Sequence, residues 1–144
     1  MDLRVTLKKS LALVGTLLAA LPLIAPIALT IMRVAGGASF IFDYLMPAEL
    51  FPLAIAGGLM ILVAGLLSRR RRWLAIGSLA AAAIFFLGIT VGAELTGLAS
   101  GAHPATGWRV ALLYGFLVLF VASEIAIVVG GILLARDLAR EPAA

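Results

Sequence analysis

The chain has 144 residues, of which 64% are hydrophobic and 12% are charged, and its formal net charge is +4. A soluble domain is about 45–50% apolar and about 25% charged, so this composition excludes a soluble fold and indicates an integral membrane protein. The chain has no cysteine, which excludes disulfides, thiolate catalysis and cysteine-ligated metals.

Charged residues divide the chain into four long runs that carry few or no charges. Each run is close to the roughly 20 residues that an α-helix needs to cross the hydrocarbon core of a bilayer. No run alternates polar and apolar residues as the strands of a membrane β-barrel do. We therefore predict an all-α fold, a single transmembrane domain over residues 1–144 that forms a four-helix bundle. The predicted spans are residues 10–32, 50–68, 73–94 and 109–135.

Basic residues are distributed unevenly between the two sides of this predicted bundle. Of the 11 lysine and arginine residues, all except Arg33 and Arg109 fall on one side. The positive-inside rule places that side in the cytoplasm, so we expect both termini there, in a prokaryotic inner membrane. Nucleic-acid binding is not expected, because the basic residues lie beside the spans and no soluble domain presents them.

The first predicted span contains Pro22 and Pro26 near its centre. Proline has no amide hydrogen, and its ring crowds the preceding turn of the helix. The carbonyls of Leu18 and Pro22 therefore lose their usual donors. We expect a bend toward a neighbouring helix, either as an ordinary feature of a membrane helix or as a hinge with exposed carbonyls.

The segment of residues 33–49 on the outer side is unusually apolar and aromatic. Aromatic side chains favour the interface between membrane and water. We expect this segment to lie in the interface or to fold back onto the bundle, where it would cover a cavity or dock a partner. The predicted docking residues are Phe40, Phe42, Asp43, Tyr44 and Glu49.

Small residues recur at helical spacing on three of the predicted spans. Such residues allow the backbones of membrane helices to approach closely. Their spacing does not distinguish packing within the chain from docking of another chain. They are Gly57, Gly58 and Gly65 in the second span, residues 80–83 with Gly88 and Gly92 in the third, and Ala122, Ala126 and Gly130 in the fourth.

Four consecutive basic residues, Arg69, Arg70, Arg71 and Arg72, precede Trp73 in the turn between the second and third spans. Basic residues at the membrane surface are attracted by anionic lipid headgroups, and tryptophan favours the headgroup level. We therefore expect the turn to contact anionic headgroups. The alternative is that these residues only set the orientation of the chain.

Glu124 lies near the middle of an otherwise uncharged run. A charge at this depth in a bilayer costs at least a few kcal/mol, so the side chain must face protein or water, find a partner, or stay protonated. Three interpretations remain open: a protonated group bonded between helices, a contact with a neighbouring subunit, or a carrier of a proton or cation. The candidate partner hydroxyls belong to Thr16, Thr30, Thr90, Tyr114 and Ser123.

Glu94 lies at the outer end of the third span, one helical turn from Thr90. Arg109 begins the fourth span at the same level, so we expect a Glu94–Arg109 ion pair or, alternatively, an acidic vestibule for cations.

His103 is the single histidine and has no second nitrogen ligand, which excludes a bis-histidine haem site within this chain. No metal or cofactor is expected.

No catalytic motif occurs in the chain, although its absence does not by itself exclude an enzyme. The leading hypothesis is an accessory or scaffold subunit of a larger membrane complex, bound to other membrane subunits or to itself. The alternative is a proton- or cation-coupled transporter or channel, a homo-oligomer that uses the carboxyl group of Glu124.

Overall fold

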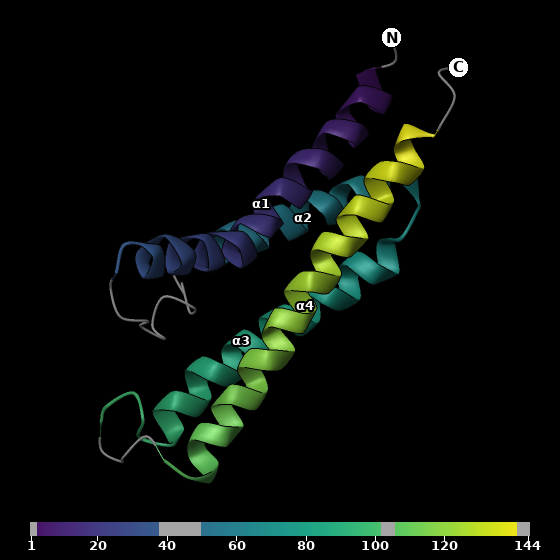
Figure 1. The fold of residues 1–144 in the computed structure, drawn as a ribbon. Coiled ribbons are helices and arrows are strands. Elements are labelled where there is room, and N and C mark those ends of the chain that lie inside the picture. Colours follow the sequence, from purple (N-terminus) through teal and green to yellow (C-terminus); the bar gives the residue numbers. More distant parts are fainter. Residues whose placement is uncertain (1–2, 38–49, 102–105, 141–144) are drawn as a thin grey trace.

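The computed structural model describes residues 3–37, 50–101 and 106–140 (Figure 1). These residues form four α-helices, each long and apolar enough to span a membrane, which confirms the all-α architecture. The predicted outer docking residues and His103 lie outside the described residues. The helices are α1 (Leu3–Ala35), α2 (Phe51–Ser68), α3 (Arg72–Leu95) and α4 (Trp108–Ala139).

Helices α2 and α3 begin and end within one residue of the spans predicted from the sequence. Helices α1 and α4 extend beyond the predicted spans, because they continue through charged residues outside the uncharged runs. Lysine and arginine can bury their aliphatic stems while the charged groups stay at the membrane surface. A charge at the end of an uncharged run therefore does not end the helix.

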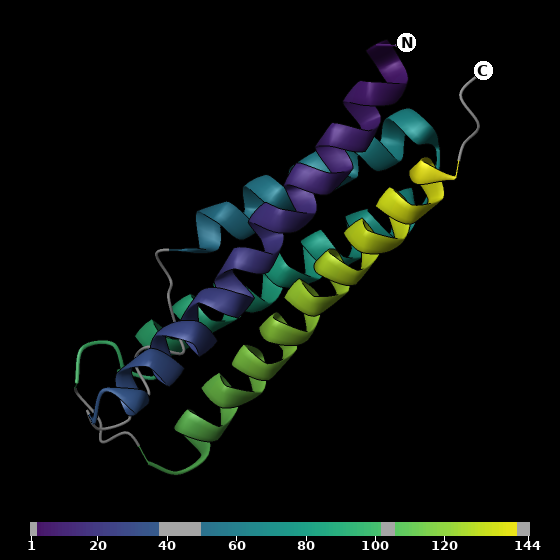
Figure 2. The same cartoon turned by 45° about the horizontal axis from the view of Figure 1, so that its top comes forward.

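The helices run up and down in succession, and helices that are consecutive in the chain are antiparallel (Figures 1 and 2). Helix α1 packs on α2 and α4, and α3 packs mainly on α4 and less on α2. The start of α1, the α2–α3 turn and the end of α4 lie at one end of the bundle (Figure 1). We call this the basic end, because among the described residues it carries Lys8, Lys9, Arg69, Arg70, Arg71, Arg72, Arg136 and Arg140.

The closest helix contact joins α1 and α2 through glycine. A Cβ atom added to Gly57 would lie 2.5 Å from the backbone oxygen of Gly15 and 2.5 Å from the backbone nitrogen of Ala19. Backbone atoms cannot move aside as the end of a flexible side chain can, so only glycine fits at position 57. A Cβ atom added to Gly131 of α4 would collide with the side-chain hydroxyl of Thr16, so α4 packs closely against the same part of α1.

Most of the predicted small-residue stripes pack within the chain. Gly58 lies against Leu79 of α3 and Ile127 of α4, and Gly130 lies against Leu74. Gly88 and Gly92 lie under side chains of α4, namely Phe116 and Leu113. The stripes on the third and fourth predicted spans are used only in part, because Ala80 and Ala122 are exposed.

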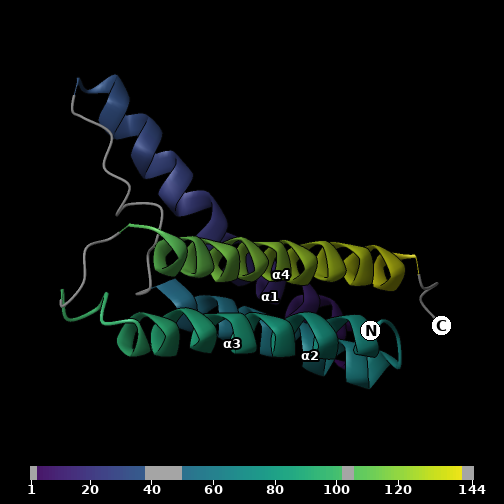
Figure 3. The same ribbon diagram turned by 90° about the horizontal axis from the view of Figure 1, so that it is seen from below.

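Helix α1 bends in the half that contains its two prolines, and its last turns diverge from the other three helices (Figure 3). Pro22 and Pro26 are both buried on the face that α1 turns toward the bundle. A proline ring crowds the carbonyl of the preceding turn and opens the helix on its own side. The helix therefore curves away from the buried face, whereas the sequence led us to expect a bend toward a neighbour.

The α2–α3 turn contains two arginines in the left-handed region, Arg69 with φ 57° and Arg71 with φ 51°. The amide of Arg69 donates to the carbonyl of Leu66, and the amide of Arg70 donates to the carbonyl of Gly65. This is the Schellman arrangement that ends many helices, usually with glycine at the left-handed position. A side chain there costs roughly 1–2 kcal/mol per residue.

Substitution of Gly57 by alanine is expected to destabilise the protein by roughly 1–3 kcal/mol, because the added methyl group collides with the backbone of α1. Gly77→Ala is the matched control, since a Cβ at Gly77 would meet nothing within 4 Å. The control is expected to be stabilising by roughly 0.5–1 kcal/mol through helix propensity. Thermal unfolding in mild detergent measures both. Equal shifts in the same direction would contradict the backbone contact.

Candidate functional site

Glu124 is the candidate site residue that the fold buries most completely. It lies on the inward face of α4, between Phe120 one turn before it and Ile127 one turn after it, and only 4% of its surface is exposed. Asp137 at the basic end follows 13 residues later in α4, about 20 Å along an α-helix. In a bilayer whose surface lies at the level of Asp137, this distance would correspond to a depth well inside a hydrocarbon core about 30 Å thick.

Three phenylalanines occupy the space between helices on the side of Glu124 that faces away from the basic end. The rings of Phe51 in α2 and Phe86 in α3 are stacked, with centroids 3.7 Å apart and an interplanar angle of 8°. Phe120 of α4 lies 5.6 Å from Phe51 and 5.9 Å from Phe86. The three rings thus join α2, α3 and α4 one turn from Glu124.

Three of the five hydroxyl groups predicted as partners of Glu124 bond within their own helices. Those of Thr16, Thr90 and Ser123 donate to carbonyls four residues earlier in their own helices, at 2.6, 3.0 and 2.8 Å. Oε1 of Glu124 is buried and has no hydrogen-bond partner among the described residues, and the same holds for Oγ1 of Thr30. A buried polar group left without a partner costs about 1–3 kcal/mol.

The other predicted members of an intramembrane site do not gather around Glu124. Thr90 and Glu94 are exposed on α3. Tyr114 is 46% exposed and precedes Glu124 in α4 by ten residues, about 15 Å along the helix. Residues that were grouped by depth in the sequence therefore face different surroundings in the fold.

The ion pair expected between Glu94 and Arg109 is not present in the structure. The guanidinium group of Arg109 lies instead over the ring of its neighbour Trp108, 5.8 Å from the centroid.

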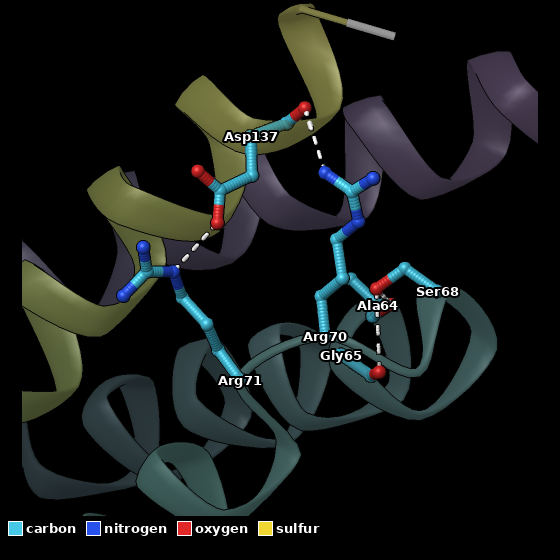
Figure 4. Close-up of polar contacts among 6 residues, drawn as sticks. All are labelled: Ala64, Gly65, Ser68, Arg70, Arg71 and Asp137. Atoms are coloured by element: carbon cyan, nitrogen blue, oxygen red, sulfur yellow. Dashed lines mark hydrogen bonds and ion pairs between the residues drawn. The ribbon is translucent and has the colours of Figure 1, made fainter.

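The basic end is held together by two arginines that converge on Asp137 (Figure 4). Nε of Arg71 lies 2.7 Å from the carboxylate oxygen Oδ2 of Asp137, and Nη1 of Arg70 donates to the backbone carbonyl of Asp137 at 3.4 Å. Cationic groups near the carbonyl end of a helix are favourable to its dipole. The α2–α3 turn is thereby attached to the end of α4.

Sequence reasoning did not identify the role of Asp137. The available signal was its charge, because it is the one acidic residue at the basic end among those described.

Trp73 is exposed beside the turn, and the guanidinium group of Arg72 lies 5.5 Å from the centroid of its ring. The predicted headgroup residues therefore lie together at this end.

The geometry offers a buried carboxyl group and a basic surface. In the described parts of the chain, no three histidine, aspartate or glutamate side chains come close enough together to hold a metal ion. Four helices of sufficient length and apolarity indicate an integral membrane protein. Comparisons with protein-family models, curated proteins and solved structures found no match for this chain.

Substitution of Glu124 by methionine is expected to raise the free energy of unfolding by roughly 1–3 kcal/mol, because it removes a buried acceptor without a partner and keeps the length of the side chain. Glu94→Met is the matched control on an exposed face and is expected to change stability little. Thermal unfolding of both variants in the same detergent tests this. A lower melting temperature for Glu124→Met would show that the carboxyl group is bonded in the folded protein.

Proposed function

We propose that the protein is an accessory or scaffold subunit of a larger membrane assembly. The observation that carries this proposal is a pair of helix faces with small residues that no other described part of the chain covers. On α3 this face contains Gly77 and Ala80, and on α4 it contains Gly115 and Ala122. A Cβ added to Gly77 or Gly115 would meet nothing within 4 Å.

The chain itself shows what such faces can bind. Where α1 meets α2, glycine allows the two backbones to approach closely at Gly15 and Gly57. Lipid tails are as apolar as leucine, so membrane helices associate through close packing rather than through the hydrophobic effect. The occupant that fits the faces of α3 and α4 is therefore a transmembrane helix of a partner subunit.

The arrangement of basic residues supports an orientation for this subunit. The described lysines and arginines are concentrated at the basic end of the bundle, where α1 begins and α4 ends (Figure 1). The positive-inside rule assigns this end to the cytoplasm, and a prokaryotic inner membrane is part of the proposal.

The test is purification of the tagged protein from its native membrane in mild detergent, with mass spectrometry of the subunits that accompany it in fixed ratio. Gly77→Leu and Gly115→Leu place bulk on the open faces and are expected to release those subunits without loss of folding. Leu87→Ile, a volume-conserving change on an exposed part of α3, is the control. A monomeric wild-type protein, or complexes unaffected by both leucine variants, would refute the proposal.

A second candidate function, proton- or cation-coupled transport, is favoured by the buried position of Glu124. A carboxyl group enclosed by its own chain is poorly placed to bond a neighbouring subunit, but it can carry a proton within the bundle. Its Oε1 has no hydrogen-bond partner in the described structure, so protonation and deprotonation would not require an internal bond to break.

For transport, Glu124→Gln is expected to abolish proton flux in liposomes, because the amide keeps the shape of the side chain but cannot release a proton in this range of pH. A pH-sensitive dye trapped in the vesicles measures the flux under an imposed gradient. Glu94→Gln removes an exposed carboxyl group and is expected to retain the flux. Equal flux in wild type and Glu124→Gln would eliminate this role.

A further inference from the structure

The basic end has a surplus of positive charge that its own acidic residues do not neutralise. Among the described residues at this end, Asp137 is the one that carries a negative charge, and it is already engaged by Arg71 and Arg70. Neither Arg69 nor Arg72 forms an ion pair with a described acidic residue. Their charges are available to a ligand outside the chain.

The conformation of Arg69 indicates that its side chain has a role. Arg69 occupies the left-handed position of the Schellman motif with φ 57°, where glycine avoids the steric penalty of a side chain. Orientation in the membrane requires only that a basic residue lie near the end of a span, and a helical position would serve that purpose without strain. An unfavourable backbone conformation in a folded protein is a reason to look for function in the side chain.

The surroundings of the turn place it at the level of the lipid headgroups. Trp73 is exposed directly after the turn, and Arg72 lies over its ring. Tryptophan favours the headgroup level of a bilayer, and the planar guanidinium group matches the geometry of a phosphate. Arg71 is fixed at the centre of the turn by Asp137 (Figure 4), which limits the positions that Arg69 and Arg72 can adopt on either side of it.

We propose that the α2–α3 turn is a binding site for the phosphate of an anionic phospholipid, with Arg69 and Arg72 as its ligands. Asp137 is a positioning residue, because it orients the turn through Arg71 and does not itself contact the phosphate. The site is independent of the proposed subunit role, since it depends on the basic end and not on the open faces of α3 and α4.

The test uses the purified full-length chain, freed of native lipid, with phosphatidylglycerol as the anionic probe and phosphatidylcholine as the zwitterionic one. Bound lipid is measured by native mass spectrometry over a series of lipid concentrations. Arg69→Gly removes the guanidinium group and the backbone strain together. We expect phosphatidylglycerol affinity to fall about fivefold, the change that corresponds to about 1 kcal/mol per basic residue at the surface, with a melting temperature equal to or above that of the wild type.

Two further variants make the result specific. Arg69→Asn also removes the charge but keeps a residue that tolerates the left-handed conformation, so it replaces Arg69→Gly if the glycine variant folds poorly. Arg109→Gln removes one positive charge at the opposite end of the bundle and is expected to leave the affinity unchanged.

The proposal is overturned if Arg69→Gly and Arg69→Asn bind phosphatidylglycerol as the wild type does. It is also overturned if Arg109→Gln loses as much affinity, which would indicate a general effect of net charge, or if phosphatidylcholine binds equally well. Displacement of the lipid by millimolar inorganic phosphate would show that the site binds free phosphate instead, and retention of the lipid under these conditions supports the lipid site.

Discussion

The close contact between α1 and α2 at Gly15 and Gly57 is the constraint on which the rest of the bundle depends. In water the burial of apolar surface would bring helices together, but in a bilayer that driving force is absent and packing at short range must replace it. The contact at position 57 is made between backbones, so it determines how deeply the helices interlock. Thr16, one residue after Gly15, then meets Gly131 of α4, which connects the pair to the second half of the bundle.

The same interface also explains the shape of α1. Its buried positions recur every three or four residues, and the last two of them are prolines. The first part of the helix is therefore held against α2 and α4, while the proline rings bend the second part away from them (Figure 3). A single buried face thus produces both the tight contact and the divergence.

The sequence was sufficient to predict four helices because charged residues stand at the ends of the apolar runs. It was insufficient to predict which face of each helix turns inward, since a helix that is apolar on all sides gives no contrast between lipid-facing and buried positions. For that reason the sequence assigned Ala122 and Gly130 to one stripe, whereas in the fold Ala122 is exposed and Gly130 packs against Leu74. Glu124 was recognised by its charge, whereas its complete burial depends on the packing of the other helices.

Polar contacts that join distant parts of the chain were the least predictable feature. Asp137 contacts the α2–α3 turn, in which two arginines adopt the left-handed conformation. No local sequence pattern reveals a left-handed arginine. The hydroxyl groups near Glu124 show the opposite case: several bond to carbonyls of their own helices, a local option that serine and threonine always have. A deprotonated carboxylate in a helix lacks that option because its oxygens can only accept hydrogen bonds. The ionised form of Glu124 therefore needs a donor from elsewhere in the bundle or from a ligand.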